Sequence, residues 1–407
     1  MFDTFLKKMK ENTDPVRGEK QTARQKWLNE WAKLYLRAYE SGRKVIYTSA
    51  YAFPGELLAA FDICFFDFEL AAAMLATTDF GVPVISEGEK RKYDMNVCSF
   101  HRAALGATYM NAFPQPDLML NISYYCDGKT KANDLIARHH GCESYLLYVP
   151  SDISAASVRY VKNQLKEIIK MIENTTGQTF DIDRLREAVK NSNKALHIQK
   201  EILDLLKQKP SPMSGREMIG YSINGHNFDG LHQKIETNLA IKHEIEYRLK
   251  SGYEKHEKHR MFWFAWITTY PSKLFEMLAA HDANVAMCET FRIHHDEIDF
   301  DDPLEGIALK CLKDPFVGSH SRRMRDMAQI IEEYDIDAAI LFATPACKHS
   351  KSTTRLFKDQ FATLNLPFLS LDIDICDPRG YAPEQIRTRI GAFMELLDNT
   401  AIELRTG

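Results

Sequence analysis

Long hydrophobic runs are missing from this 407-residue chain. No stretch approaches the roughly 18 consecutive apolar residues that a membrane-spanning helix needs. The start, MFDTFLKKMKEN, lacks the apolar centre of a secretory signal peptide. The chain also lacks a basic excess, since its formal net charge is −4 and its pI is about 6.4. We therefore expect a cytoplasmic protein that engages neither a membrane nor nucleic acid.

Two common nucleotide-binding motifs are missing as well. There is no GxGxxG, and the Gly-Lys-Thr of CDGKTK (126–131) lacks the glycine that a P-loop requires five residues earlier, where Ser123 stands. The sequence therefore predicts no ATP or dinucleotide site in this chain.

Compositional bias is equally absent, because 45% of the residues are hydrophobic, 27% are charged, and no tract is rich in Gln, Asn, Ser or Pro. A globular chain of this length is too long to fold around one ordinary hydrophobic core, so we expect two α/β units or a large bilobal body.

Short apolar runs suited to β-strands fall into two groups of four. The first group is 44–50, 62–68, 117–123 and 144–150, and the second is 261–267, 283–289, 337–343 and 367–373. Helix-forming stretches separate most of them, which is typical of parallel sheets built from βαβ units.

We therefore predict an α/β fold with two similar four-stranded parallel-sheet lobes. The expected boundaries are an N-terminal helical segment at 1–43, a first lobe at 44–155, a helical insert at 156–260 and a second lobe at 261–407.

Eight cysteines are present, at positions 64, 98, 126, 142, 288, 311, 347 and 376, with no CxxC and no zinc spacing. In a reducing compartment we expect no disulfides, and a buried cysteine is most simply a small hydrophobe. Two of the eight stand out because each comes after a predicted strand. Cys126 follows DLMLNISYY and Cys347 follows AAILFATPA. Ligands bind beyond the carboxyl ends of parallel strands, so these two thiols should face one cleft.

A third candidate, Cys98, lies in DMNVCSFHRAALGATYM, where Asn96 or Ser99 would cap the helix that carries it. A helix N-terminus lowers the pKa of a thiol and favours the metal-binding thiolate. Soft thiolates that converge on a cleft suit an iron–sulfur cluster. Three thiolates rather than four would leave one iron open to a substrate oxygen, water or an external sulfur.

Several motifs, in this order, resemble one known family over nearly the whole chain. They are CSFHR at a helix start, DLMLNISYYC, FDIDRLREAVKNS (180–192), DPLEGIALKCL (302–312), ATPACK and the closing DICDPRGYAPEQIRTRIGAFMELL. Together they are similar to the 2-hydroxyacyl-CoA dehydratase and benzoyl-CoA reductase family. The resemblance implies a 4Fe-4S cluster held by Cys98, Cys126 and Cys347. A double-cubane 8Fe-9S cluster is the alternative, and Cys288 and Cys311 would then be further thiols to consider.

The resemblance also implies partners and a chemistry. The partners are a related second cluster subunit, a separate ATP-dependent iron–sulfur activator protein and an acyl-CoA substrate. The activator would deliver one electron, which the thioester carbonyl holds as a ketyl-type radical. That radical expels a neighbouring hydroxyl in a dehydratase, whereas an aryl thioester accepts further electrons in a reductase. A homomeric double-cubane reductase of small molecules and a non-enzymatic electron-transfer module remain alternatives.

Two residues are candidates for catalysis. Glu69, in FFDFELAAA, corresponds to an acidic residue that the family places near its substrate, and a carboxylate against an apolar run can act as an acid or base. A salt-bridged structural glutamate is the alternative. By register, Tyr51 stands where dehydratases of the family carry a serine, and this departure gives weight to the reductase interpretation.

Other polar clusters have weaker interpretations. Arg322, Arg323 and Arg325 would meet CoA phosphates or cover a solvated helix face. The histidine pairs at 139–140, 256 with 259, and 294–295 are expected to be solvated rather than metal-binding.

Overall fold

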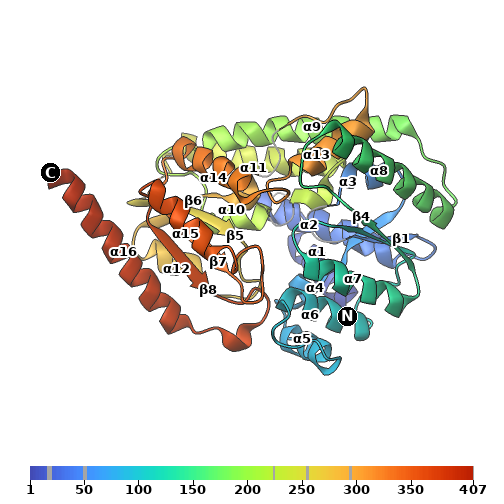
Figure 1. Ribbon diagram of the computed structural model, residues 1–407, viewed down its shortest axis with the longest axis horizontal. Coiled ribbons are helices and arrows are strands. Elements are labelled where there is room, and N and C mark those ends of the chain that lie inside the picture. Colours follow the sequence, from blue (N-terminus) through green and yellow to red (C-terminus); the bar gives the residue numbers. More distant parts are fainter. Residues whose placement is uncertain (16–20, 49–52, 223–224, 254–255, 293–295, 407) are drawn as a thin grey trace.

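The computed structural model describes residues 1–15, 21–48, 53–222, 225–253, 256–292 and 296–406. Its core is a pair of four-stranded sheets in which every strand pairing is parallel. Figure 1 shows the two sheets side by side, each surrounded by helices, with the long helix α9 running along one edge of both. The predicted fold class, two similar parallel-sheet lobes with helices at the N-terminus, is confirmed.

The strands of the two sheets follow the predicted runs closely. The first lobe holds β1 (Val45–Thr48), β2 (Cys64–Asp67), β3 (Leu118–Ile122) and β4 (Glu143–Leu147). The second lobe holds β5 (His259–Ala265), β6 (Ala283–Cys288), β7 (Ala338–Ala343) and β8 (Phe368–Asp372). All but β4 and β8 are buried along their whole length, because helices cover both faces of a parallel sheet.

The strand order explains where a ligand would bind. The first sheet has the order β2-β1-β3-β4 and the second has the order β6-β5-β7-β8. In each lobe the chain therefore reverses its direction of winding between the first and third strands. Such a reversal leaves a crevice beyond the carboxyl ends of those two strands, which is where ligands of open α/β sheets bind.

Helices from both halves of the chain tie the lobes together. The segment between the sheets contains α8 (Ala155–Thr176), α9 (Ile182–Leu205), α10 (Gly215–Ser222) and α11 (His232–Lys250). Helix α13 (Pro303–Lys313), which belongs to the second half of the chain, packs on α8 and α9. The N-terminal helices α1 (Phe2–Thr13) and α2 (Ala23–Leu36) pack on each other, and α2 also packs on α11 and on β2.

Two helices of the first lobe approach each other unusually closely. They are α5 (Gly81–Lys90) and α6 (Ser99–Tyr109). A Cβ atom added at Gly106 would lie 1.8 Å from the backbone oxygen of Val84, so only glycine allows this contact. The close packing holds the start of α6, which carries Cys98, in a fixed place.

The remaining helices flank the sheets. They are α3 (Gly55–Ala59), α4 (Phe68–Leu75), α7 (Asp127–His140), α12 (Leu274–Ala279), α14 (His320–Glu333), α15 (Thr354–Thr363) and α16 (Pro383–Thr406). Helix α16 runs along the outer side of the second lobe, away from the first (Figure 1). Ile386, Ile390, Phe393 and Leu397 form its buried stripe, with the spacing of an amphipathic helix.

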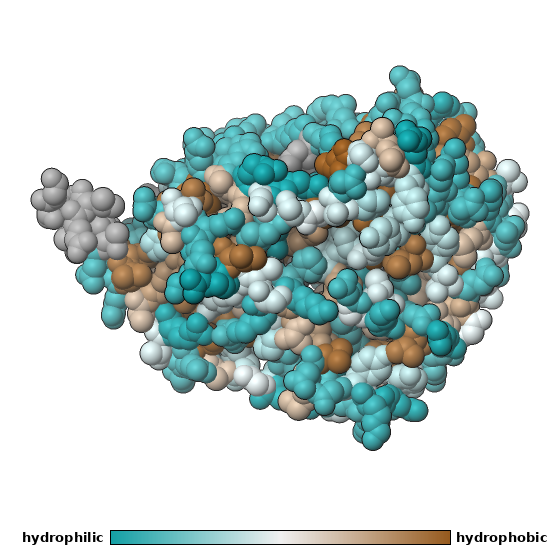
Figure 2. Space-filling view, in the orientation of Figure 1, coloured by the Kyte–Doolittle hydropathy of each residue, from teal (hydrophilic) through white to brown (hydrophobic). Residues whose placement is uncertain are grey.

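On the face shown in Figure 2, hydrophobic residues are scattered among hydrophilic ones rather than gathered in one patch. Within the described parts of the chain, no helix combines the length and the apolar character that crossing a membrane requires.

Candidate functional site

A pocket lies where the two lobes meet, and its volume is about 90 Å³. Its wall includes Cys98, Cys126 and Cys347. A water molecule needs about 10–15 Å³ of such space, so the pocket has room for a group of several atoms. The structure thus brings together the three thiols that the sequence singled out, and we call this space the cysteine pocket.

The two strand-end cysteines follow the same backbone conformation. Cys126 follows β3 and Cys347 follows β7, and the residue before each has a positive φ, 73° at Tyr125 and 64° at Ala346. Residues other than glycine rarely adopt this conformation, and such strain is concentrated at functional sites. The repetition in both lobes indicates that the turn serves to aim the thiol.

Cys98 itself occupies the N-cap of α6, so the prediction that Asn96 or Ser99 caps this helix is wrong. The predicted direction of its pKa is also wrong. Burial, reinforced by the neighbouring Cys347 thiol, raises the pKa of Cys98 well above its ordinary value. Desolvation of the thiolate therefore outweighs the favourable helix terminus.

The Cys126 thiol has a different environment. Burial raises its pKa, but His101 and the backbone N–H groups of Gly128 and Lys129 outweigh that effect, so the pKa is lowered overall. The sulfur lies 3.5 Å from Nε2 of His101. Burial alone lowers the pKa of His101, but its contacts with Cys126 and Glu69 raise it to about 9.

Glu69 lines the same pocket and is only 1% exposed. It lies in the first turn of α4, directly after β2, and Asp67 caps that helix by accepting from the backbone N–H of Leu70. Oε1 of Glu69 is 3.5 Å from Nδ1 of His101. Tyr51, the other candidate for catalysis, lies outside the described residues.

Further polar groups of the wall were not predicted. Lys129 is buried one turn after Cys126; burial lowers its pKa, and its ammonium donates to the backbone oxygen of Tyr124 at 3.1 Å. Thr344, at the end of β7, is 1% exposed, and its hydroxyl has no hydrogen-bond partner among the described residues. In the sequence, one feature could have indicated Lys129 and Thr344: each is three residues away from a strand-end cysteine.

Aromatic side chains enclose the rest of the pocket. Phe100, Tyr125, Trp266 and Phe316 all line it. The ring of Tyr125 packs on that of Phe316 with centroids 4.7 Å apart, and its hydroxyl donates to Asp314 at 3.2 Å. Burial raises the pKa of Asp314 to about 7. These groups keep the thiols in a largely apolar surrounding.

A second cavity, of about 330 Å³, adjoins the cysteine pocket. Phe100, Trp266 and Ile375 line both spaces. Leu70 and Met74 continue along α4 from Glu69 into this mainly apolar cavity. An elongated ligand could therefore occupy the cavity and reach the thiols with one end.

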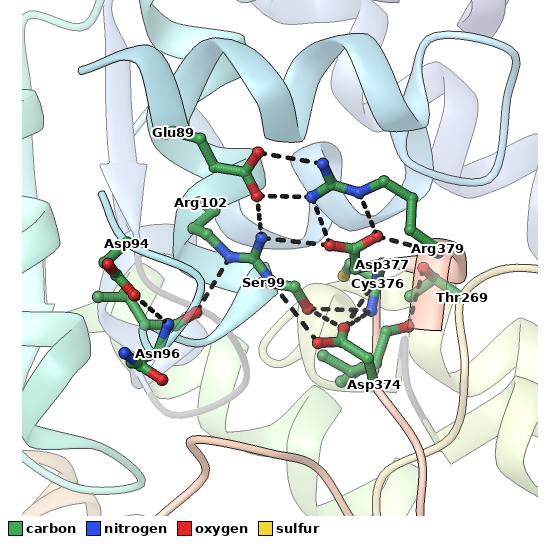
Figure 3. A network of polar contacts seen from close by, with 12 residues as sticks. Glu89, Asp94, Asn96, Ser99, Arg102, Thr269, Asp374, Cys376, Asp377 and Arg379 are labelled. Carbon is green, nitrogen blue, oxygen red and sulfur yellow. Dashed lines mark hydrogen bonds and ion pairs between the residues drawn. The ribbon is translucent and has the colours of Figure 1, made fainter. Parts of the chain in front are cut away.

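A network of charges joins the lobes beside Cys98 (Figure 3). Arg102, on α6, is 2% exposed and contacts Glu89 of α5 together with Asp374 and Asp377 of the loop after β8. Arg379 contacts both Glu89 and Asp377. The side chain of Ser99 donates to Asp374. The closing motif that carried part of the family resemblance thus binds the helix that presents Cys98.

The sequence leaves two alternatives open for Arg322, Arg323 and Arg325, CoA phosphates or a solvated helix face. Arg325 is exposed, as the second alternative expects, whereas the other two contact neighbouring protein groups. Arg322 donates to the backbone oxygens of Leu312 and Asp314. Arg323 is buried, pairs with Glu289 at 2.5 Å and lies over the ring of Phe316. Both guanidinium groups therefore act within the fold.

The predicted solvation of the histidine pairs holds only in part. His256 is exposed, but His259 is buried in β5 and contacts Asp398 at 2.7 Å. Residues 294–295 lie outside the described residues.

The other thiols are separate from the cysteine pocket. Cys288 and Cys311 are each 1% exposed and do not line the pocket, and burial raises the pKa of each to about 12. Cys376 is fully buried behind Ser99, whose hydroxyl accepts from its backbone N–H at 3.2 Å. In the described chain, therefore, only the three predicted thiols line the wall.

The thiols of the pocket are donors of the kind that an iron–sulfur cluster takes. Among the described residues, no three His, Cys, Asp or Glu groups are gathered as the ligands of one metal ion would be. Thiolates of a cluster bind different iron atoms and stand further apart. Three soft sulfur donors in one largely apolar pocket match such a group.

Comparison with known proteins shows which sequences the chain resembles. Residues 50–397 match the family model described as 2-hydroxyglutaryl-CoA dehydratase, D-component. The alpha subunit of (R)-2-hydroxyglutaryl-CoA dehydratase from Acidaminococcus fermentans is 24% identical over 79% of this chain and 68% of its own length. A benzoyl-CoA reductase subunit from Thauera aromatica is 25% identical over 88% of this chain and 90% of its own. The (R)-phenyllactyl-CoA dehydratase alpha subunit of Clostridium sporogenes is 23% identical over 89% and 91%.

Proposed function

Because the chain belongs to the 2-hydroxyglutaryl-CoA dehydratase D-component family, we propose that it is the iron–sulfur subunit of a radical enzyme that dehydrates 2-hydroxyacyl-CoA thioesters. Its relatives are named as subunits of dehydratases and of a reductase that act on CoA thioesters, so the protein is an enzyme subunit. The proposal includes a related second subunit and an ATP-dependent activator protein as partners.

The observation that carries the proposal is the shared position of three thiols in one pocket. Cys98, Cys126 and Cys347 would hold a 4Fe-4S cluster there. When bound, such a cluster supplies one-electron transfer at low potential and one iron that is open to a substrate oxygen. Cys288 and Cys311 do not line the pocket, which favours a single cubane over a double cubane.

The chain's own residues would bind and protonate the substrate. The hydroxyl of Thr344, which has no partner among the residues that the structure describes, would donate to an oxygen of the thioester, because a buried hydroxyl without a partner costs about 1–3 kcal/mol. Glu69 would hold or accept a proton in the buried wall. Phe100, Trp266 and Phe316 would exclude water, which strengthens every electrostatic contact in the pocket.

The adjoining apolar cavity would take part of the acyl-CoA. It shares a wall with the cysteine pocket and holds about 330 Å³. The substrate would thus present its thioester to the thiols while its apolar portion extends along α4.

A ring reductase of the benzoyl-CoA type is the second candidate. A relative of that name covers most of the chain, and Tyr51 stands where dehydratases of the family carry a serine. The phenol of Tyr51 would then serve as a proton donor, since its ordinary pKa of about 10 keeps it protonated.

The test is a reconstitution under anaerobic conditions. The chain, its co-purified partner, an activator, ATP and a reductant are mixed with a 2-hydroxyacyl-CoA or with benzoyl-CoA, and the products are identified by mass spectrometry. We expect loss of water from the hydroxyacyl thioester, whereas gain of hydrogen by the aryl thioester would select the reductase. Turnover of neither thioester, or ATP hydrolysis by the isolated chain, would contradict the proposal.

A further inference from the structure

His101 lies between a sulfur and a carboxylate in the wall of the cysteine pocket. Its Nε2 is 3.5 Å from Sγ of Cys126, and its Nδ1 is 3.5 Å from Oε1 of Glu69. The residue is 6% exposed, so water does not compete strongly for either nitrogen. A distance of 3.5 Å is within the range of a hydrogen bond to sulfur, which is a larger acceptor than oxygen.

Three different elements fix this arrangement. His101 lies on α6, three residues after Cys98, so one helix carries both a thiol of the pocket and the partner of another thiol. Cys126 immediately precedes α7, and Glu69 belongs to the first turn of α4. A Cβ atom added at Gly128 would lie 3.4 Å from Sγ of Cys126 and 3.6 Å from the ring of His101. The sulfur and the ring are therefore packed together against Gly128.

We infer that His101 is a positioning residue, which donates a hydrogen bond from Nε2 to the sulfur of Cys126 and thereby sets the orientation of that sulfur and the reduction potential of the iron–sulfur group it would hold. The inference rests on the proposed function. A hydrogen bond to a ligand sulfur stabilises the more negative, reduced state, so it raises the potential. Groups that contact metal ligands in this way commonly tune metal affinity and activity.

The opposite nitrogen gives the ring its orientation. Glu69 faces Nδ1 and Cys126 faces Nε2, so the ring donates to the sulfur when Nε2 carries a proton. Lys129 also belongs to the wall, but its ammonium donates to the backbone oxygen of Tyr124. Among the described side chains, His101 is the one that lies within hydrogen-bond distance of a pocket thiol.

The geometry suggests a set of matched variants. The amide nitrogen of glutamine can take the place of Nε2, whereas that of asparagine takes the place of Nδ1 and falls short of the sulfur. His101→Gln therefore retains the donor and His101→Asn removes it, with similar polarity. His101→Phe keeps the ring and removes both nitrogens. His349→Gln is the control, because His349 shares the pocket wall but lies within hydrogen-bond distance of no described thiol.

The experiment measures the midpoint potential of each purified protein by anaerobic titration followed by electron paramagnetic resonance, together with iron and sulfide content. We expect His101→Asn and His101→Phe to shift the potential to more negative values, and His101→Gln and His349→Gln to remain near the unsubstituted protein. If His101→Phe does not fold, the difference in midpoint potential between His101→Asn and His101→Gln still tests the inference.

Equal potentials in His101→Asn and His101→Gln, at equal iron content, would overturn the inference while leaving the proposed function intact. An unsubstituted protein that holds neither iron nor sulfide would instead overturn the proposed function itself. The two failures are therefore distinguishable.

Discussion

The guanidinium group of Arg102 lies 3.2 Å from the carboxylate of Asp377, although the two residues are 275 positions apart in the sequence. Arg102 belongs to the first lobe and Asp377 to the second, and both stand beside the helix start that presents Cys98. The contact thus links the two lobes beside the start of the helix that presents Cys98.

Removal of this guanidinium should destabilise the fold. Arg102→Met leaves Glu89, Asp374 and Asp377 with less compensation, and a buried charge without its partner costs about 3–5 kcal/mol. Urea denaturation would measure the loss. Arg91→Met is the control, because Arg91 is an exposed residue whose pair with Glu87 is worth less than about 1 kcal/mol. Similar losses in both variants would show that the network does not link the lobes as described.

The same network should make stability sensitive to acid. Contacts with Arg379 lower the pKa of Glu89, and at Asp377 contacts with Arg379 and Arg102 overcome the opposing effect of burial and lower the pKa too. A carboxyl whose pKa is lower in the folded state stabilises the fold above its unfolded pKa and loses that contribution as the pH falls through the folded value.

We therefore expect the free energy of unfolding to fall between about pH 5 and pH 3, near and below the ordinary carboxyl pKa values. The doubly substituted Glu89→Gln, Asp377→Asn protein should be less stable at neutral pH and should show a shallower fall. Denaturation curves collected across this range would measure both slopes, and identical slopes would argue against the assignment.

Glu69→Gln tests the proposed proton transfer. Since Glu69 is buried in the pocket wall, we expect a loss of turnover of about 10²-fold or more, with the iron content retained. Glu87→Gln, at a partly buried position of α5 that is not in the pocket wall, should leave turnover unchanged. Full activity of Glu69→Gln with the true substrate would assign the proton transfer to another residue, and Tyr51→Phe would then be the next variant to assay.

Thr344→Val tests the hydroxyl that has no partner in the described structure. Valine has a similar shape, so the free protein should be as stable as before or slightly more stable, because the buried hydroxyl no longer needs a partner. The affinity for the acyl-CoA should fall, as measured by calorimetry. Ser350→Ala removes another buried hydroxyl without a described partner, one that is not in the pocket wall, and should not change the affinity. If the unsubstituted protein, Thr344→Val and Ser350→Ala have equal affinities, the hydroxyl of Thr344 does not bind the substrate.

Much of the fold was predictable because each strand is an apolar run of its own. Burial on both sides of a parallel sheet requires such runs at β3 and β7, and their order along the chain predicted the two lobes. The convergence of Cys126 and Cys347 followed from the rule that ligands gather beyond the carboxyl ends of parallel strands.

The errors concern contacts between distant residues. Nothing near Arg323 in the sequence shows that Glu289 will lie opposite it, so neither expectation for this arginine, a CoA phosphate or a solvated helix face, describes its contacts. The pKa of Cys98 was predicted in the wrong direction because local sequence shows the helix terminus but not the depth of burial. The role of His101 was missed for the same reason, although it is part of the CSFHR motif.

If Cys98, Cys126 and Cys347 hold one iron–sulfur cluster, the iron and sulfide content of anaerobically purified variants will show it. We expect the content of one 4Fe-4S cluster per chain in the unsubstituted protein. Most of this iron should be lost when any of the three cysteines is changed to Ala, whereas no iron should be lost when Cys288 or Cys311 is changed. Full iron in all three pocket variants, or an equal loss in the Cys288 and Cys311 variants, would show that these three thiols are not the ligands of the cluster.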